Sequence, residues 1–297
     1  MLNNVDDVDD VDGVGDAGEL LELCQPFNVV SLVGLNKSAG KSTVLAKLIR
    51  AYHDAGRSSP LAVTSVGRGG ALPEIRLFTG MYAATAAGAL KDCDFTRRIL
   101  HTSGVPTPLG EVVVTEALTD GKVSLAGPSI ASQLHALCEY MRELGAGQVF
   151  VDGAGDRRTF VDPTAGAILC VGAGISRDVN TAARQCAHMC RLMTLPVATN
   201  CTNSHKVSGA LTDDILAEHN SDALTVVDSS KIFLSFELLE RFFHKGGQIF
   251  VEKPTNLIAV TINPTAPTYT FDRNEFIAAV KGRIHVPVFD VLAREII

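Results

Sequence analysis

The sequence predicts an α/β protein in which helices cover both faces of a mostly parallel β-sheet. Short apolar segments alternate with helical ones along the chain, which is typical of such folds. Several apolar segments are continuous Val, Ile, Leu and Ala runs, as expected of strands buried on both faces. The chain has 297 residues, of which 46% are hydrophobic, enough for one large domain or two small ones.

Each element is predicted from its own local pattern. Apolar runs predict strands at 29–33, 61–64, 111–115, 149–151, 167–171, 197–199, 225–227, 249–251, 257–262 and 286–289. Helical periodicity predicts helices at 42–55, 129–144, 180–193, 212–219, 235–244 and 273–280. Gly127-Pro128 precedes the second of these helices, and a Gly-Ala-Gly sequence follows Leu144 and ends it.

The predicted organisation has three parts. Residues 1–20 form an acidic tail that we expect to be disordered, because it is too polar to offset its ordering entropy. Residues 21–202 form a nucleotide-binding core, and residues 203–297 an α/β extension packed on the same core. Within the core, residues 67–110 are rich in Gly, Pro and Ala and interrupt the alternation. We expect this stretch to form an excursion or cap.

Charge and composition restrict the function classes. The formal net charge is -7, and residues 1–19 carry seven acidic side chains and no Lys or Arg, so the rest of the chain is nearly neutral. A neutral body with an acidic tail argues against nucleic-acid binding, which needs a basic face. No apolar run is long enough to span a membrane, and no secretory signal is recognisable. Seven scattered cysteines fit reduced thiols, so we expect a cytoplasmic protein.

The strongest motif follows the first predicted strand. Gly40-Lys41-Ser42-Thr43 opens a helix directly after a strand and a loop, which is the context of a phosphate-binding P-loop. Gly34 is followed by five residues before Gly40, one more than the usual spacing. The residues expected to contact ATP are Asn36, Lys37, Ser38, Ala39, Gly40, Lys41, Ser42 and Thr43. The alternative interpretation is a glycine-rich turn before a capped helix.

Two of these loop residues carry the expected chemistry. Lys41 would bridge the β- and γ-phosphates, and the Ser42 hydroxyl would bind Mg²⁺. Lys37 is a second candidate catalytic lysine. It is either functional, acting across a homodimer as in some P-loop proteins, or a solvated loop residue.

Asp152 is the candidate acidic partner for Mg²⁺. It ends the apolar run Gln148 to Val151, which places its carboxylate at the same sheet edge as the P-loop. The alternative is a turn aspartate before Gly153. Arg157 follows shortly after, and its guanidinium could stabilise phosphate charge.

Other candidates carry weaker signals. Asn200 follows a strand and either reads a purine base or sits in a turn, and Arg68 either touches phosphate or a partner or is solvated. Cys186 and Cys190 bracket His188 on one helical face, but this spacing alone is a weak metal motif. Cys201 and His205 fit a loop as easily as a ligand pair. The phenylalanines between residues 233 and 243 line a partner groove or a buried helix face.

The chain resembles two groups of P-loop proteins. The loop spacing is similar to the branch that contains dethiobiotin synthetase and the Min-type ATPases, and Val151-Asp-Gly-Ala-Gly155 resembles its V-E-G-A-G stretch. A longer resemblance, from Val33 to about Val291, is to the P-loop ATPase subunit of the lysine 5,6-aminomutase reactivase. The segments that carry it are VGLNKSAGKST, AVTSVGRGG, PLGEVVV, AGPSIASQL, FVDGAGDRR, ISRDVNTA, IAVTINPTAP and VPVFDV. After Arg68, Gly69-Gly70-Ala71 replaces the acidic stretch expected in that family.

The resemblance implies a P-loop fold and a Mg-ATP-dependent role. The expected activity is restoration of an adenosylcobalamin-dependent aminomutase after its cobalamin is damaged, together with a second reactivase subunit. Two alternatives stay open: a dethiobiotin synthetase-like ligase or kinase that acts on a small molecule, and a nucleotide-gated binding module without hydrolysis.

Overall fold

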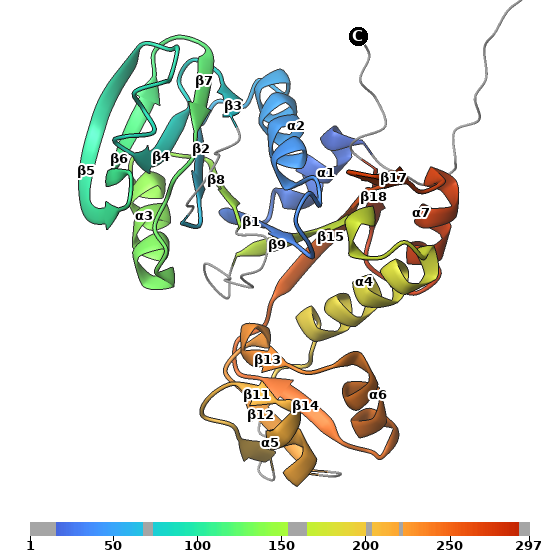
Figure 1. Cartoon of the computed structure of the whole chain (residues 1–297). Coiled ribbons are helices and arrows are strands. Elements are labelled where there is room, and N and C mark those ends of the chain that lie inside the picture. The colour runs from blue at the N-terminus through green and yellow to red at the C-terminus, as the bar shows by residue number, and fades with distance from the viewer. Residues whose placement is uncertain (1–15, 68–73, 154–164, 200–203, 220–221, 291–297) are drawn as a thin grey trace, which may run out of the picture.

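The structure, a computed structural model, describes residues 16–67, 74–153, 165–199, 204–219 and 222–290. Within these ranges the chain has seven α-helices and a large, mostly parallel sheet, which confirms the predicted α/β class (Figure 1). The helices are α1 (Ala17–Cys24), α2 (Lys41–Asp54), α3 (Ala131–Glu143), α4 (Val179–Met193), α5 (Asp213–Glu218), α6 (Phe236–His244) and α7 (Arg273–Lys281).

The central sheet has nine strands. They are β1 (Val29–Gly34), β2 (Leu61–Ser65), β4 (Tyr82–Ala86), β5 (Arg97–Thr107), β6 (Gly110–Ala117), β8 (Gln148–Asp152), β9 (Gly166–Gly172), β15 (Asn256–Asn263) and β18 (Val288–Phe289). Their order is β18-β15-β9-β1-β8-β2-β4-β6-β5. All neighbours from β18 to β4 are parallel, and β6 and β5 add an antiparallel edge.

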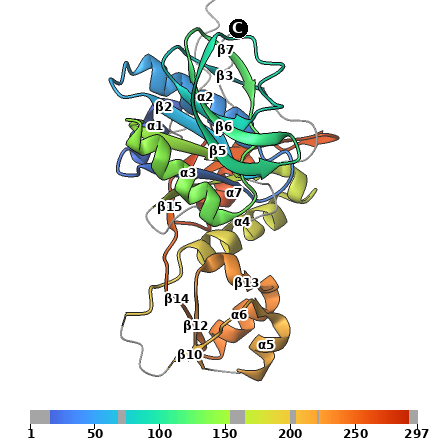
Figure 2. The same ribbon diagram turned by 90° about the vertical axis from the view of Figure 1, so that its left-hand side faces the viewer.

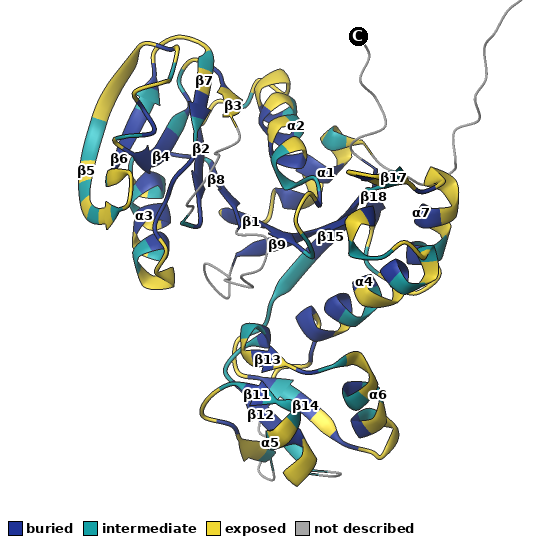
Figure 3. Cartoon of the chain, viewed as in Figure 1, coloured by how far each residue is buried: buried dark blue, intermediate teal, exposed yellow. Residues whose placement is uncertain are grey.

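Side chains alternate between the two faces of this sheet, as the period of a strand requires. In β9, Ile168 and Cys170 pack into the core that contains α1 and α2, whereas Leu169 and Val171 pack against α4 and α7. The α3 helix covers the same face as α4, over β8 and β2. Figure 3 shows the resulting buried strands between partly exposed helices. Each fully buried Leu or Ile contributes about 1.5–3 kcal/mol to folding.

The α1 helix begins inside the segment that was expected to lack structure. Asp16 caps it: its side-chain Oδ1 accepts hydrogen bonds from the backbone N–H groups of Gly18 at 2.7 Å and Glu19 at 3.0 Å. Leu20, Leu21 and Cys24 are buried against the rest of the core. The acidic cap therefore belongs to the folded body, and residues 1–15 lie outside the described residues.

The stretch expected as an excursion, residues 67–110, and the residues just after it contain strands that the sequence analysis missed. β3 (Glu74–Leu77) and β7 (Gly121–Ser124) form an antiparallel pair beside α2. β4 joins the central sheet parallel to β2, and the long β5–β6 hairpin extends its edge. Ala and Gly in this region weakened the strand pattern in the sequence, although their small side chains fit close strand packing.

The segment after residue 203 falls into two parts. The first contains a three-stranded parallel sheet of β10 (Ser204–Lys206), β12 (Ala223–Val226) and β14 (Gln248–Val251), with α5, α6 and the short strands β11 (Leu211–Thr212) and β13 (Ile232–Phe233). It has its own apolar core and forms a smaller lobe below the central sheet (Figures 1 and 2). The second part, from residue 256, returns as β15 and β18 to the central sheet. The chain thus enters the smaller lobe after α4 and leaves it through β15.

The smaller lobe differs from the sequence analysis at the strand predicted for 197–199, and it divides the phenylalanines between 233 and 243 into two groups. The predicted strand at 197–199 is only a single bridge between Val197 and Val251. The phenylalanines divide between core and surface: Phe242 is buried, whereas Phe233 is 59% exposed.

No helix in the described ranges has the length and apolar character that a bilayer crossing requires.

Candidate functional site

The loop predicted to hold phosphate joins β1 to α2 at the carboxyl edge of the central sheet. Leu35 donates its backbone N–H to the carbonyl of Cys170 at 2.9 Å, which continues the β1–β9 pairing into the loop. Ser38 and Gly40 both have positive φ, 61° and 89°. Glycine adopts this conformation without strain, so Gly40 is suited to the sharp entry into the helix. The loop is a compact turn that ends on the first residue of α2.

Asparagine side chains fix this loop to the neighbouring strands. Asn36 accepts a hydrogen bond at Oδ1 from the Gly172 N–H at 3.2 Å, and its Nδ2 donates to the Lys37 carbonyl at 2.8 Å. Asn263 donates from Nδ2 to the Ser38 carbonyl at 3.0 Å. Gly172 lies against the loop, since a Cβ atom there would be 2.9 Å from Ala39 Cα. Residues at the ends of β9 and β15 therefore hold the loop in place through these hydrogen bonds and this close packing.

The start of α2 presents a positive potential to the loop. Gly40 caps the helix without a side-chain hydrogen bond, and the first intrahelical bond runs from the Val44 N–H to the Gly40 carbonyl. The N–H groups of the first turn and the helix dipole together favour an anion at this end. Lys41 adds a full charge. Its Nζ lies over the end of β1, 2.5 Å from where a Cβ of Gly34 would be.

Asp152 ends the strand next to β1. It pairs in register with Leu32 of β1 and with Ser65 of β2, and it is 2% exposed. Gly153 follows it and donates its N–H to the Leu32 carbonyl at 2.9 Å. A Cβ atom at Gly153 would lie only 2.3 Å from the Leu32 carbonyl oxygen, so this close approach needs glycine.

Strand register places the buried thiol of Cys170 near both Lys41 and Asp152, since Cys170 pairs with Gly34, over which Lys41 Nζ lies, and Asp152 pairs with Leu32 of the same strand. Burial raises the pKa of this thiol to about 12, the neighbouring Thr261 side chain and the Lys41 charge oppose the rise, and the Asp152 charge reinforces it. Cys170 itself pairs with Gly34 on one side and Thr261 on the other. An ammonium and a carboxylate thus act on the same buried position at the base of the loop.

The end of β2 completes the same sheet edge. Gly67 donates its N–H to the Pro128 carbonyl at 2.7 Å, and Gly127 donates to Ser65 Oγ at 3.1 Å. Residues 126–129 therefore lie beside the end of β2, next to Asp152. These small residues leave backbone, and not bulky side chains, at this part of the edge.

The structure brings together most, but not all, of the residues predicted for the site. Ala39 is buried and Lys41 and Ser42 are half-buried, whereas Lys37, Ser38 and Thr43 are exposed. Arg157, Asn200 and Arg68 lie outside the described residues. Sequence reasoning missed Asn263 and Gly172. The sequence feature that could have identified them is that each directly follows a predicted strand of the same parallel sheet.

A cavity of about 710 Å³ lies elsewhere, between α4, α6 and residues 283–286. Its arginines are already engaged. Arg191 forms an ion pair with Glu240, and Arg283 donates to Asn180 Oδ1 at 2.9 Å and to the Ala279 carbonyl at 2.7 Å. The sheet edge at the loop between β1 and α2 is thus the stronger candidate for phosphate binding.

Comparison with protein-family models and with curated proteins finds no match. The functional interpretation therefore depends on the geometry of the site and on the motifs in the sequence.

Proposed function

We propose that this chain is a P-loop nucleoside triphosphatase that binds ATP with Mg²⁺. The observation that carries the proposal is the placement of Lys41 and Asp152 at one sheet edge, at the start of the helix that follows β1 and at the end of the strand beside β1. P-loop enzymes need both groups: a lysine for the terminal phosphates and an acidic residue for the metal. A glycine-rich turn without function would not require a carboxylate at the end of the adjacent strand.

The residues of the chain divide the work of such a site. The N–H groups at the start of α2 bind phosphate oxygens, and Lys41 neutralises charge on the terminal phosphates. Ser42 and Asp152 offer the oxygen ligands that Mg²⁺ prefers, directly or through water. Bound Mg²⁺ would neutralise charge that develops on the phosphates. Asn36 and Asn263 hold the loop carbonyls, so that its N–H groups stay available to the ligand.

The proposed biological role is reactivation of an adenosylcobalamin-dependent aminomutase. The resemblance in sequence motifs supports this role, and the smaller lobe supplies a second structural unit that a partner protein could contact. ATP binding can open a partner only if the ATP and ADP states bind that partner differently. β15 connects the smaller lobe with the loop, since it runs from the lobe to Asn263.

The test is steady-state ATP hydrolysis by the purified chain, with and without an aminomutase that has been allowed to inactivate. We expect slow basal turnover that the inactivated aminomutase raises, and a loss of about 100-fold or more in Lys41→Ala. Lys91→Ala, which changes an exposed lysine outside the loop, is the matched control. A rate of ATP hydrolysis that the aminomutase does not change, but that a small metabolite raises, would favour the ligase interpretation instead. ATP binding without turnover in any condition would favour the nucleotide-gated module.

A further inference from the structure

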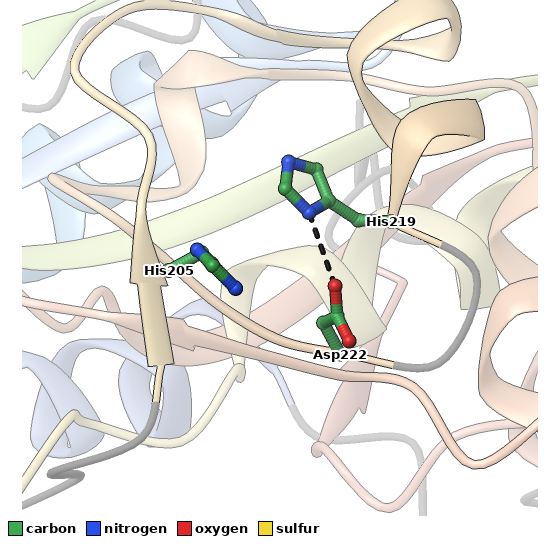
Figure 4. Close-up of side chains that lie close together, drawn as sticks. All are labelled: His205, His219 and Asp222. Carbon is green, nitrogen blue, oxygen red and sulfur yellow. Dashed lines mark hydrogen bonds and ion pairs between the residues drawn. The ribbon is translucent and has the colours of Figure 1, made fainter.

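Two histidines and an aspartate meet on the smaller lobe, away from the P-loop. His205 lies on β10, His219 directly follows α5, and Asp222 precedes β12. One ligand atom from each lies within 4.8 Å of the others. Figure 4 shows the three side chains around a common space, with a ring nitrogen of His205 turned toward the other two. We propose that these residues form a binding site for a divalent transition-metal ion of the Zn²⁺ class.

The backbone around the cluster is held by the sheet of the lobe. His205 pairs with Leu224 in the parallel β10–β12 ladder, and Thr225 Oγ1 donates to Ser204 Oγ at 2.8 Å. The Asp222 carbonyl accepts a hydrogen bond from the Gln248 N–H at 3.2 Å, which ties it to β14. The three side chains thus project from secondary structure or its immediate ends, and they need only rotamer changes to meet an ion.

The distances suit a small four-coordinate ion. His219 Nδ1 and Asp222 Oδ2 are 3.1 Å apart. Two ligand atoms about 2.0–2.1 Å from a tetrahedral Zn²⁺ lie about 3.4 Å apart, so this pair already has nearly the required separation. The ring centroids of His205 and His219 are 5.1 Å apart, so rotation of the His205 side chain can bring its imidazole to the same ion.

The donor chemistry selects the class of ion. Two imidazole nitrogens and one carboxylate favour Zn²⁺, Co²⁺, Ni²⁺ or Fe²⁺ over Mg²⁺ and Ca²⁺, which prefer oxygen ligands. Because His219 donates a hydrogen bond to Asp222, the Asp222 carboxylate can take part in binding the metal ion in two ways. The carboxylate binds the ion directly, or it orients His219 so that the other ring nitrogen binds, as second-sphere carboxylates do in many zinc sites.

The site is open to solvent, so an ion can enter and one coordination position can take water or a partner group. The side chains of His219 and Asp222 are 25% and 46% exposed. This site is separate from the proposed nucleotide site and does not depend on it, since none of its residues lies in the loop or at the sheet edge described above.

The test is Zn²⁺ titration of the full chain, without nucleotide and without a histidine tag, followed by calorimetry. We expect about one Zn²⁺ per chain and a binding-dependent rise in Tm. His205→Ala and His219→Ala should each weaken binding at least about tenfold, and Asp222→Asn should weaken it by a similar factor. His244→Ala removes an exposed histidine of α6 in the same lobe and should leave the affinity unchanged.

The proposal is overturned if the wild-type chain shows no saturable binding, or if binding survives the His205→Ala/His219→Ala double substitution. Unchanged affinity in Asp222→Asn would also contradict a site made of all three residues. His205→Gln and His219→Gln repeat the test with side chains of similar length, in case an alanine variant folds poorly. Lys41→Ala should bind Zn²⁺ normally, which separates failure of this site from failure of the nucleotide site.

Discussion

Asn263 and Ser38 are 225 residues apart in sequence, yet the Asn263 amide donates a 3.0 Å hydrogen bond to the Ser38 carbonyl. Asn263 is the last residue of β15, the strand by which the chain returns from the smaller lobe. A second bond, from the Thr265 N–H to Asn263 Oδ1, holds the asparagine side chain in place. The position of the loop between β1 and α2 is therefore tied to the strand that connects the two parts of the protein.

Asn263→Ala should loosen the loop and weaken ATP binding several-fold. One lost hydrogen bond costs about 0.5–1.5 kcal/mol, part of which appears as affinity if the bond holds the loop in its binding conformation. Asn256→Ala is the matched control, because it removes a 3.3 Å amide–carbonyl bond to Ala165 at the other end of the same strand. Calorimetric titration with ATP should separate the two variants. Equal affinities would show that Asn263 contributes to stability alone.

Gly172→Ala should displace the loop. A Cβ atom at this position would lie 2.9 Å from Ala39 Cα and 3.1 Å from the Ser38 carbonyl oxygen, so the loop must shift to accept it. We expect ATP affinity to fall at least about tenfold, because one loop misplaced relative to α2 misaligns several N–H groups together. Gly209→Ala is the control, since no atom lies within 4 Å of its added Cβ. Wild-type affinity in Gly172→Ala would contradict the packing of the loop on β9.

The buried thiols should make the protein less stable at high pH. Burial raises the pKa values of Cys24, Cys138 and Cys170 from 9.0 to about 12. The folded state then holds these protons where the unfolded state loses them. The contribution to stability is complete below about pH 9 and is lost as the pH rises toward 12, by up to about 1.4 kcal/mol per pH unit and thiol.

Urea unfolding at pH 8 and pH 10 measures this effect. Cys138→Ala removes one buried thiol from the core beneath α3, so it should lose less stability than the wild type between the two pH values, although its stability at pH 8 is lower. The difference between the two chains isolates the thiol from the lysines and tyrosines that titrate in the same range. Equal losses would contradict the raised pKa of Cys138.

Local patterns predicted the parts of the fold that depend on local chemistry. The apolar run before Gly34 and the Gly-Lys-Ser-Thr sequence placed β1 and the start of α2 within a residue, because a buried strand and a glycine-led helix start are both readable along the chain. The α1 helix was missed because its single buried turn follows directly after the acidic residues. β3 and β5 were missed because both are antiparallel strands with few large apolar residues, and the partner of β3, β7, lies more than 40 residues further along the chain.

The residues that support the candidate site were harder to predict. Asp152 could be found, since an apolar strand ended on it. The contact between Asn263 and Ser38 depends on β15 lying beside β9, and sheet order over such a sequence separation is set by tertiary packing. The same applies to the cluster of His205, His219 and Asp222, in which three short elements of the smaller lobe must assemble before the side chains meet.

The most direct test of the central claim is equilibrium ATP binding with and without Mg²⁺, measured by calorimetry on the wild type, Lys41→Ala and Asp152→Asn. The account predicts that the wild type binds one ATP per chain, that Mg²⁺ tightens binding, that Lys41→Ala weakens it about 100-fold, and that Asp152→Asn removes most of the Mg²⁺ effect. Lys91→Ala should bind as the wild type does. ATP binding that is absent, or that is unchanged by both substitutions, would contradict a P-loop site at this sheet edge.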